Sequence, residues 1–252
     1  MLTIKNLFVE VNDKKILNDF NIDIKDGEIH AIMGPNGTGK STLSKVILGN
    51  KNYEVKNGDI IFDGESINGL STDEIARRGL FVSFQNPISI EGVQNSEFIK
   101  TALNERRENA IGLFEFVKMI KEKVKELDIN EEMMHRSVNV GASGGERKKN
   151  EVLQLELLEP KMIILDELDS GLDIDSLKKV CEVINNYLKE HKKTSVLIIT
   201  HYPRILEYIK PKFVHMMVCG KIVKTGDYKL AFEIEKSGYS DTSVIGSDLK
   251  DE

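Results

Sequence analysis

The sequence predicts an α/β fold in which a mixed-sheet core carries an antiparallel β part at its N-terminus and an inserted helical segment. Three observations support this prediction. A strand, a glycine-rich loop and the start of a helix follow one another over residues 28–48. Residues 162–166 are a continuous apolar run, as in buried parallel strands. Residues 95–135 contain no proline and repeat apolar residues at helical spacing.

The same patterns predict the organisation of the chain. We expect one domain over residues 1–252, in which residues 1–85 and 143–236 form the α/β core. Residues 86–142 are expected to form a helical subdomain inserted into that core. Residues 237–252 are polar, and we expect them to form a flexible tail.

The N-terminal elements are predicted from alternation and turn residues. Residues 2–11 and 15–24 alternate apolar and polar residues on either side of Asn12-Asp13, which is typical of an antiparallel pair. Residues 58–64 predict a short strand that ends in an Asp-Gly turn. A capping box over residues 71–74 predicts the start of a short helix, and residues 80–84 predict another strand.

The predicted helical segment has one apolar stripe. Its members recur at steps of three and four residues and are Leu113, Phe116, Val117, Ile120, Val124 and Leu127. We expect this stripe to face the protein interior and the charged residues to face solvent. The alternative is that the charged face of this segment binds a partner protein.

The α/β alternation resumes after this segment. Strands are expected over residues 162–166 and 196–200, and a helix over residues 174–189 between them. A short helix over residues 204–209, a hairpin over 213–225 and a helix over 228–235 are expected to follow.

Composition excludes several classes of protein. The formal charge is −6, from 41 acidic and 35 basic residues, which argues against binding nucleic acid mainly through charge. No apolar run approaches the roughly 18 residues of a membrane helix, and the N-terminus enters a strand pattern without a leader segment. Two isolated cysteines do not form a disulfide framework. We therefore expect a cytoplasmic protein.

The glycine-rich loop carries the strongest motif in the chain. It matches G-x-x-x-x-G-K-[ST] between a strand and a helix, and consists of Gly34, Pro35, Asn36, Gly37, Thr38, Gly39, Lys40 and Ser41, followed by Thr42. Its glycines allow successive N–H groups to point into one concavity at a helix N-terminus, where phosphate oxygens bind. Lys40 is expected to reach the β- and γ-phosphates, and the Ser41 hydroxyl to bind Mg²⁺.

Two carboxylates end the apolar strand over residues 162–166. Asp166 is expected to bind Mg²⁺ directly or through water, and Glu167 to polarise the water that attacks the nucleotide. An apolar run followed by Asp-Glu is a weak signal when it stands alone. It becomes strong downstream of a phosphate-binding loop.

A second anion site is predicted at residues 143–146. Ser143, Gly144, Gly145 and Glu146 come directly before a helical run, so N–H groups, a hydroxyl and a helix N-terminus coincide there. One bound nucleotide does not need two phosphate sites in the same chain. We therefore expect this site to close over a nucleotide held by a second copy of the chain.

Together these motifs resemble the ATP-binding cassette (ABC) ATPases, which are P-loop NTPases, across nearly the whole chain. The resemblance identifies residues 143–146 with the signature motif that acts in trans. It implies that Gln85 is a ligand of Mg²⁺ and water that senses the γ-phosphate. Ser170 and Asp173 occupy the D-loop, and His201 occupies the position of the histidine that contacts the γ-phosphate. ATP and Mg²⁺ are the implied ligands.

The sequence departs from the usual ABC pattern at several positions. Ala142 and Glu146 stand where the signature commonly has leucine and glutamine, and Val11 occupies the position of the aromatic residue that stacks on adenine. Phe8 or Tyr53 is a candidate to replace that aromatic residue.

The wider sequence around residues 140–215 resembles the SufC family, the soluble cassette ATPases of the SUF system for iron–sulfur cluster assembly. This resemblance implies SufB and SufD, or two copies of SufB, as partners that bind through the helical subdomain. It also implies an ATP-dependent homodimer within that complex. We further expect Lys148, in the helix after the signature, to pair with Glu167 in the resting protein.

Two alternatives remain open at this point. The general motifs fit equally well the nucleotide-binding cassette of a membrane ABC transporter. A regulatory module that uses nucleotide only for dimerisation is a second alternative, although Glu167 argues against it because such a switch needs no catalytic base. A cassette for DNA repair is disfavoured by the acidic charge and by the short spacing between the two phosphate motifs.

Overall fold

The computed structural model describes residues 1–239, and the predicted α/β fold is confirmed. The predicted tail lies outside the described residues from residue 240 on. The chain forms two compact units. The first contains Met1–Val82, Met162–Glu167 and the chain from Lys193 on, and the second contains Ser83–Lys161 and Leu168–Lys192. No helix among the described residues is long and apolar enough to cross a membrane.

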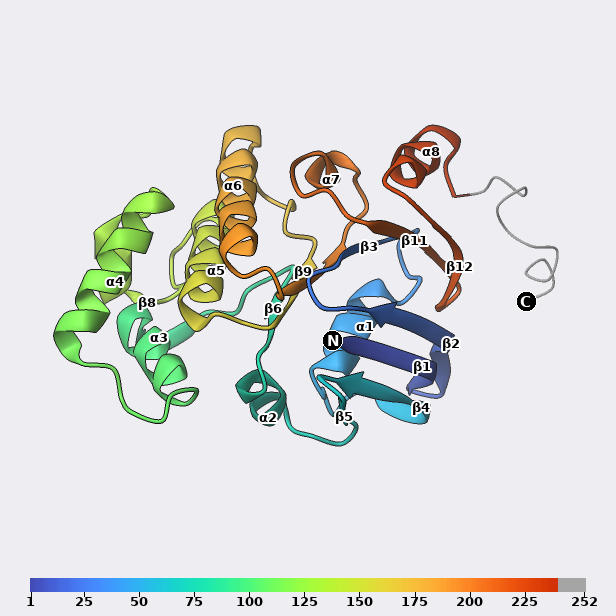
Figure 1. Ribbon diagram of the computed structural model, residues 1–252, viewed down its shortest axis with the longest axis horizontal. Helices are drawn as coiled ribbons and strands as arrows, with labels where there is room; N and C mark the ends of the chain where they lie inside the picture. Colours follow the sequence, from blue (N-terminus) through green and yellow to red (C-terminus); the bar gives the residue numbers. More distant parts are fainter. Residues whose placement is uncertain (240–252) are drawn as a thin grey trace. The chain divides into compact units, whose positions relative to one another are not determined.

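An antiparallel sheet forms the N-terminal part of the first unit (Figure 1). Its strand order is β2-β1-β4-β5, and its strands are β1 (Leu2–Val11), β2 (Lys14–Ile24), β4 (Glu54–Phe62) and β5 (Glu65–Ser66). Leu2 lies opposite Ile24 on one side and Phe62 on the other. These three side chains are buried, so one face of this sheet contributes to the core, as its alternating pattern predicts.

A six-stranded sheet forms the centre of the first unit, with strand order β12-β11-β3-β10-β9-β6. Its strands are β3 (Ile29–Met33), β6 (Leu80–Ser83), β9 (Met162–Asp166), β10 (Ser195–Ile199), β11 (Phe213–Val218) and β12 (Lys221–Gly226). β11, β3, β10 and β9 are parallel, whereas β12 pairs antiparallel with β11. Ile199 lies opposite Asp166 on one side and Ile32 on the other. The carboxyl ends of β3, β9 and β10 therefore meet at one edge of this sheet.

Helices complete the first unit: α1 (Lys40–Ile47), α2 (Thr72–Arg77), α7 (Arg204–Tyr208) and α8 (Lys229–Ser237). α1 buries Leu43, Val46 and Ile47 in a cluster that also contains side chains of both sheets. α2 begins with the predicted capping box, in which Ser71 and Glu74 bond each other's backbone N–H groups. Burial of the apolar face of α1 fixes the position of the loop that precedes it.

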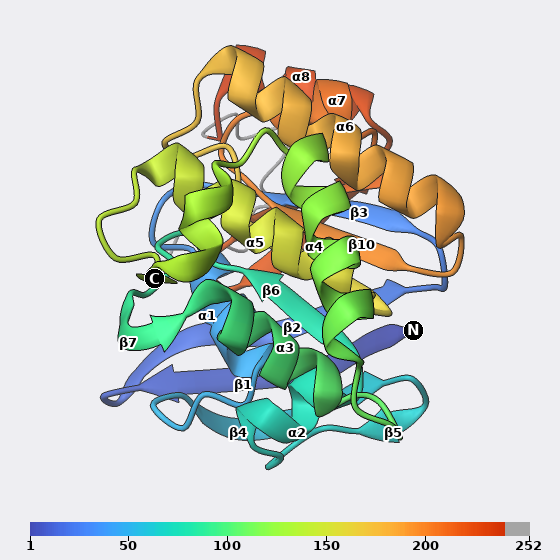
Figure 2. The same ribbon diagram turned by 90° about the vertical axis from the view of Figure 1, so that its left-hand side faces the viewer.

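The second unit consists mainly of helices (Figure 2). They are α3 (Asn95–Asn104), α4 (Leu113–Glu126), the 3₁₀ helix Glu131–His135, α5 (Gly144–Leu158) and α6 (Ile174–Glu190), with the small strands β7 (Ile90–Gln94) and β8 (Ser137–Val138). α5 contacts α3, α4 and α6 and is the central helix of this unit. α4 buries Phe116, Ile120 and Val124 as predicted. Leu113 and Val117, which we placed on the same stripe, are exposed because they lie at its margin in the first turns of the helix.

The helical unit is larger than the insertion expected from the sequence. The predicted boundaries were 86–142, whereas the unit also includes α5 and α6. The sequence pattern places these two helices within an α/β alternation, so it assigned them to the core. In the structure α5 packs against α3 and α4, and this packing groups it with the helical unit.

A polar chain with two buried histidines at its centre connects β3, β11 and β12 of the first unit. Lys212 Nζ lies 2.7 Å from Glu28 Oε1, and Glu28 Oε2 lies 3.1 Å from His30 Nε2. His30 Nδ1 lies 2.9 Å from His215 Nε2, and His215 Nδ1 lies 2.8 Å from the Thr225 hydroxyl. Because a carboxylate only accepts, His30 donates to Glu28, His215 donates to His30, and Thr225 donates to His215. Both imidazoles are neutral in this arrangement.

Acid is expected to destabilise the protein through these two histidines. Burial lowers the pKa of His30, and burial with the nearby His30 lowers the pKa of His215 to about 4. A depressed folded-state pKa stabilises the protein fully above the unfolded value near 6.5, and this stabilisation is lost as pH falls toward 4. The free energy of unfolding, measured with urea from pH 7 to 5, should fall by up to about 1.4 kcal/mol per pH unit for each histidine.

A histidine-free variant is the control for this prediction. His30→Gln combined with His215→Gln removes both titrating groups, so its free energy of unfolding should change less between pH 7 and 5. The same pH slope in this variant and in the unmodified protein would show that other groups cause the acid sensitivity.

Candidate active site

The glycine-rich loop lies in the first unit between β3 and α1. Gly37 and Gly39 have φ angles of 80° and 96°, which L side chains rarely adopt. A Cβ atom on Gly34 would lie 2.2 Å from the Met217 carbonyl oxygen, so only glycine fits there. The Thr38 hydroxyl donates to the Pro35 carbonyl across the loop at 3.0 Å. The backbone therefore adopts the curled form that the motif predicts.

The Lys40 ammonium lies inside this loop. Its Nζ donates to the carbonyl oxygens of Gly34 at 2.8 Å and Pro35 at 2.7 Å. Lys40 is only 4% exposed, and burial lowers its pKa to about 8 despite the nearby carboxylates of Glu167 and Asp166. The loop carbonyls thus hold the cation at the position where an incoming phosphate would meet it.

The affinity for a nucleotide is expected to fall when Lys40 loses its proton. Because the pKa of Lys40 is about 8, the dissociation constant for ATP should be nearly constant below pH 8. Above it, that constant should rise by up to about tenfold per pH unit, and calorimetry from pH 7 to 9.5 measures this change. Arginine does not deprotonate in proteins, so Lys40→Arg should bind ATP with a flatter pH profile. An equally steep rise in Lys40→Arg would contradict the assignment to Lys40.

Asp166 lies at the carboxyl end of β9 and is 3% exposed. The Ser44 hydroxyl lies 2.7 Å from Asp166 Oδ2 and 3.0 Å from the Ser41 carbonyl oxygen. Ser44 therefore links the carboxylate to the first turn of α1, which carries Ser41. The Ser41 hydroxyl and the Asp166 carboxylate are hard oxygen donors, and such donors suit a divalent cation such as Mg²⁺.

Glu167 and His201 form a close pair at the same edge of the sheet. His201 Nε2 lies 2.7 Å from Glu167 Oε1, and His201 Nδ1 lies 3.1 Å from the Gly34 carbonyl oxygen. A carbonyl only accepts, so Nδ1 carries a proton and a further proton lies between Nε2 and the carboxylate. Glu167 itself has a φ of 50°, an unusual conformation for a residue with a side chain, and such conformations are concentrated at functional sites.

The structure thus brings together, within the first unit, the phosphate loop, Asp166, Glu167 and His201. Gln85, residues 143–146, Ser170 and Asp173 belong to the second unit. Gln85 is exposed in the segment that follows β6. Each unit therefore carries one part of the predicted set of site residues.

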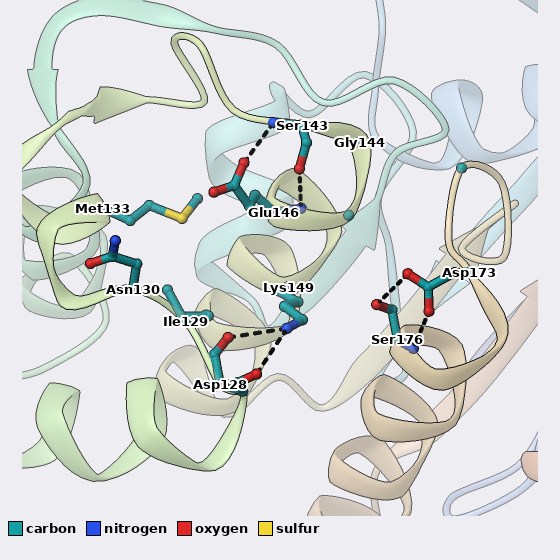
Figure 3. Close-up of a pocket in the computed structure, with 12 residues that line it drawn as sticks. Asp128, Ile129, Asn130, Met133, Ser143, Gly144, Glu146, Lys149, Asp173 and Ser176 are labelled. Carbon is teal, nitrogen blue, oxygen red and sulfur yellow. Dashed lines mark hydrogen bonds and ion pairs between the residues drawn. The ribbon is translucent and has the colours of Figure 1, made fainter.

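The signature residues form the N-terminus of α5 and line a pocket of the second unit (Figure 3). The Ser143 hydroxyl accepts from the Glu146 N–H at 3.3 Å, while the Glu146 carboxylate accepts from the Ser143 N–H at 2.8 Å. These contacts form a capping box, and the backbone bonds lower the pKa of Glu146. The N-terminus of α6 lines the same pocket through Asp173, whose carboxylate accepts from the Ser176 N–H at 2.8 Å.

The pocket has a volume of about 480 Å³ and is lined by both polar and apolar residues. Lys149 lies beside the signature residues and donates to the Asp128 carbonyl oxygen at 3.1 Å (Figure 3). The Ser143 side chain also bonds the Glu146 carboxylate, so both the backbone and the hydroxyl of Ser143 lower the pKa of Glu146.

A family comparison agrees with this geometry. Residues 17–170 match the ABC transporter family. The chain belongs to this family. As a member of the ABC family, it binds nucleotide and hydrolyses ATP.

Relatives of the ABC family match nearly the whole chain. The probable ATP-dependent transporter SufC of Escherichia coli is 48% identical over 95% of this chain and 97% of its own length. Vegetative protein 296 of Bacillus subtilis is 49% identical over 94% of this chain and 91% of its own length. The probable ATP-dependent transporter ycf16 of Pyropia yezoensis is 50% identical over 95% and 96%.

Solved ABC cassettes share the fold. A cassette solved as a dimer in a post-hydrolysis state with ADP and Pi superposes with a TM-score of 0.78 at 22% identity, covering 90% of this chain and 99% of the other. A second dimeric structure of the same cassette gives a TM-score of 0.78 at 23% identity over the same shares. At these identities the likeness establishes the ABC fold alone.

Sequence reasoning missed two features of this ABC site. Ser44, which bonds Asp166, lies three residues after Ser41 and so shares its helix face, a spacing that could have indicated its role. Lys148 was expected to pair with Glu167, but its ammonium contacts the Phe84 carbonyl and the Glu151 carboxylate instead. Glu167 pairs with His201.

Proposed function

We propose that this ABC ATPase is the ATP-hydrolysing subunit of a SUF complex for iron–sulfur cluster assembly, acting in the cytoplasm. The observation that carries this proposal is the 48% identity with the relative named SufC over 95% of the chain. The resemblance of residues 140–215, which lie within this aligned stretch, to the SufC family agrees with it. The proposed partners are SufB and SufD, or two copies of SufB, bound through the helical second unit, which contains residues 86–142.

ATP is the proposed substrate, held through its phosphates by the loop over residues 34–42. The curled backbone offers N–H groups at the N-terminus of α1, and Lys40 adds a cation whose bonds to loop carbonyls a phosphate can replace. Mg²⁺ would be held by Ser41 and Asp166, with Gln85 as a further ligand implied by the ABC resemblance. Bound there, it would neutralise charge on the phosphate oxygens.

Glu167 and His201 are the proposed catalytic pair. The proton held between Glu167 and His201 Nε2 first moves to the imidazole. The free Glu167 carboxylate can then accept a proton from the attacking water. His201 then donates through Nε2 toward the γ-phosphate, while the Gly34 carbonyl fixes the other ring nitrogen. In the free protein, the hydrogen bond with His201 keeps Glu167 from accepting a proton from water until a phosphate binds.

We infer that the site is completed by a second copy of the chain. Ser143, Gly144 and Gly145 of one copy would close on the γ-phosphate held by Lys40 and Ser41 of the other, with Ser170 and Asp173 at the contact. A phosphate held from both sides binds the closed dimer better than the open one, which is the differential affinity that drives closure. Hydrolysis removes this contact and releases the dimer. Closure of the dimer on ATP would move the two scaffold subunits relative to each other.

Identification of the chains that bind this protein tests the proposed function directly. The tagged protein should be purified without detergent from the cells that make it, and the associated chains identified by mass spectrometry. Recovery of SufB-like or SufD-like chains, with higher ATPase activity in the complex than in the isolated subunit, is the expected result. ATPase activity without these chains would contradict the cluster-assembly function while leaving the enzyme intact.

A cassette of a membrane transporter is the second candidate. Relatives carry the names probable ATP-dependent transporter and, in Streptococcus pyogenes, probable ABC transporter ATP-binding protein. The same purification distinguishes the two candidates, because a transporter cassette should be recovered with membrane-spanning subunits when detergent is present.

A further inference from the structure

Two charged side chains of α5 are buried against the segment that contains Gln85. Glu151 Oε1 accepts from the Phe84 N–H at 2.9 Å, and Glu151 Oε2 accepts from the Ser83 hydroxyl at 2.8 Å. The Lys148 ammonium donates to the Phe84 carbonyl oxygen and lies 3.3 Å from Glu151 Oε2. Lys148 and Glu151 are 2% and 5% exposed. Both backbone polar groups of Phe84 are therefore bonded to one turn of α5.

Asparagines attach the other end of the same segment to α5. The fully buried Asn150 donates from Nδ2 to Asn95 Oδ1 at 2.8 Å and to Asn139 Oδ1 at 3.1 Å. Asn139 in turn donates to the Ile88 carbonyl oxygen at 2.8 Å. Residues 84–95 are thus held at their start by Lys148 and Glu151, and at their end by the asparagines.

Ser143 caps the N-terminus of α5, so the helix that carries these bonds also carries the signature residues at its start. Lys148 lies in the second turn of that helix. A displacement of Phe84 would have to break two backbone bonds to charged groups or displace the helix as well. Hydrogen bonds to charged groups are stronger than those between neutral groups, so separating the segment from the helix is costly.

Stability alone explains this arrangement poorly. Burying an ion pair is costly, and apolar side chains of similar size often stabilise a protein as well or better. The same helix offers a comparison, because Glu156 also pairs with a lysine, with its Oε1 2.7 Å from Lys123 Nζ. That pair joins α5 to α4, whereas Lys148 and Glu151 bind the backbone next to Gln85.

We propose that Lys148 and Glu151 are positioning residues that make the Gln85 segment and the signature helix α5 move as one body. This inference rests on the proposed function, in which Gln85 senses the γ-phosphate and Ser143 binds it in trans.

Variants of the two residues test this proposal in the full-length protein. Glu151→Gln and Lys148→Met each remove one charge, and the double variant removes both, so that no buried charge is left unpaired. Glu156→Gln is the matched control, since it removes a buried carboxylate from the same helix without touching Phe84. Measurements for each variant are the ATP dissociation constant, kcat, the melting temperature, and hydrogen exchange of residues 84–88 and 143–148.

The expected result distinguishes a positioning role, which kcat reports, from a contribution to stability, which the melting temperature reports. The ATP dissociation constant should stay within about twofold in all variants, because the phosphate loop and Lys40, which hold ATP in the first unit, are unchanged. In Glu151→Gln and Lys148→Met, kcat should fall by about 10- to 100-fold from misplacement of reacting groups. The double variant should regain melting temperature while kcat remains low. In Glu156→Gln the melting temperature should fall and kcat should not.

Hydrogen exchange keeps this test apart from the test of the proposed function. In the ligand-free protein, residues 84–88 should exchange in concert with 143–148, and in Glu151→Gln they should exchange faster and independently. This readout decides the proposal even if the purified chain shows no turnover. Unchanged exchange at residues 84–88, or equal losses of kcat in Glu151→Gln and Glu156→Gln, would overturn it.

Discussion

Replacement of Glu167 by glutamine is expected to lower kcat for ATP hydrolysis by about 10²- to 10⁴-fold, the usual contribution of a general base. Glutamine keeps the size of the side chain but cannot accept the proton of the attacking water. ATP binding should be retained, because the phosphate loop and Lys40 are unchanged. Steady-state hydrolysis together with calorimetric titration of ATP measures both effects.

A variant that binds ATP but does not hydrolyse it should also accumulate as a closed dimer with ATP. Size-exclusion chromatography with and without ATP detects this species. A kcat within about twofold of the unmodified protein would remove Glu167 from the role of base, since loss of a positioned base costs far more.

The second large effect is expected at Lys40. Methionine at this position fills the buried space but cannot donate to phosphate, and a charge-assisted hydrogen bond contributes about 1.5–3 kcal/mol. The ATP dissociation constant of Lys40→Met should therefore rise by about 10- to 150-fold, with hydrolysis lost at ordinary ATP concentrations. Calorimetry measures the first change.

Stability is the control for Lys40→Met. The variant loses donors to the Gly34 and Pro35 carbonyls but buries no unpaired charge, so its melting temperature without ATP should change little. The rise in melting temperature that ATP gives the unmodified protein should disappear. An unchanged response to ATP in Lys40→Met would contradict the placement of Lys40 at the phosphates.

Local patterns predicted most of the fold. The antiparallel pair of β1 and β2, the buried strand β9 and the capping box of α2 all depend on near neighbours in sequence, and the structure confirms each of them. The grouping of elements was less predictable. Contacts of α5 with α3 and α4 join segments separated by many residues, and no periodicity encodes such contacts.

The candidate site shows the same division. The loop glycines and the carboxylates at the end of β9 follow from motifs, because backbone conformation and strand ends have sequence signals. The partners of individual charges do not. Lys148 lies near Glu151 rather than Glu167, since the choice depends on how a long side chain is buried in the folded unit.

A mixing experiment tests most directly the central claim that each nucleotide site is completed by a second copy of the chain. Lys40→Met cannot hold ATP, and Ser143→Arg blocks the signature residues, so each variant alone should be inactive. In an equal mixture, half of the dimers pair one copy of each variant and contain one intact site, so ATPase activity should recover to about a quarter of normal. A mixture as inactive as its components would contradict the shared site.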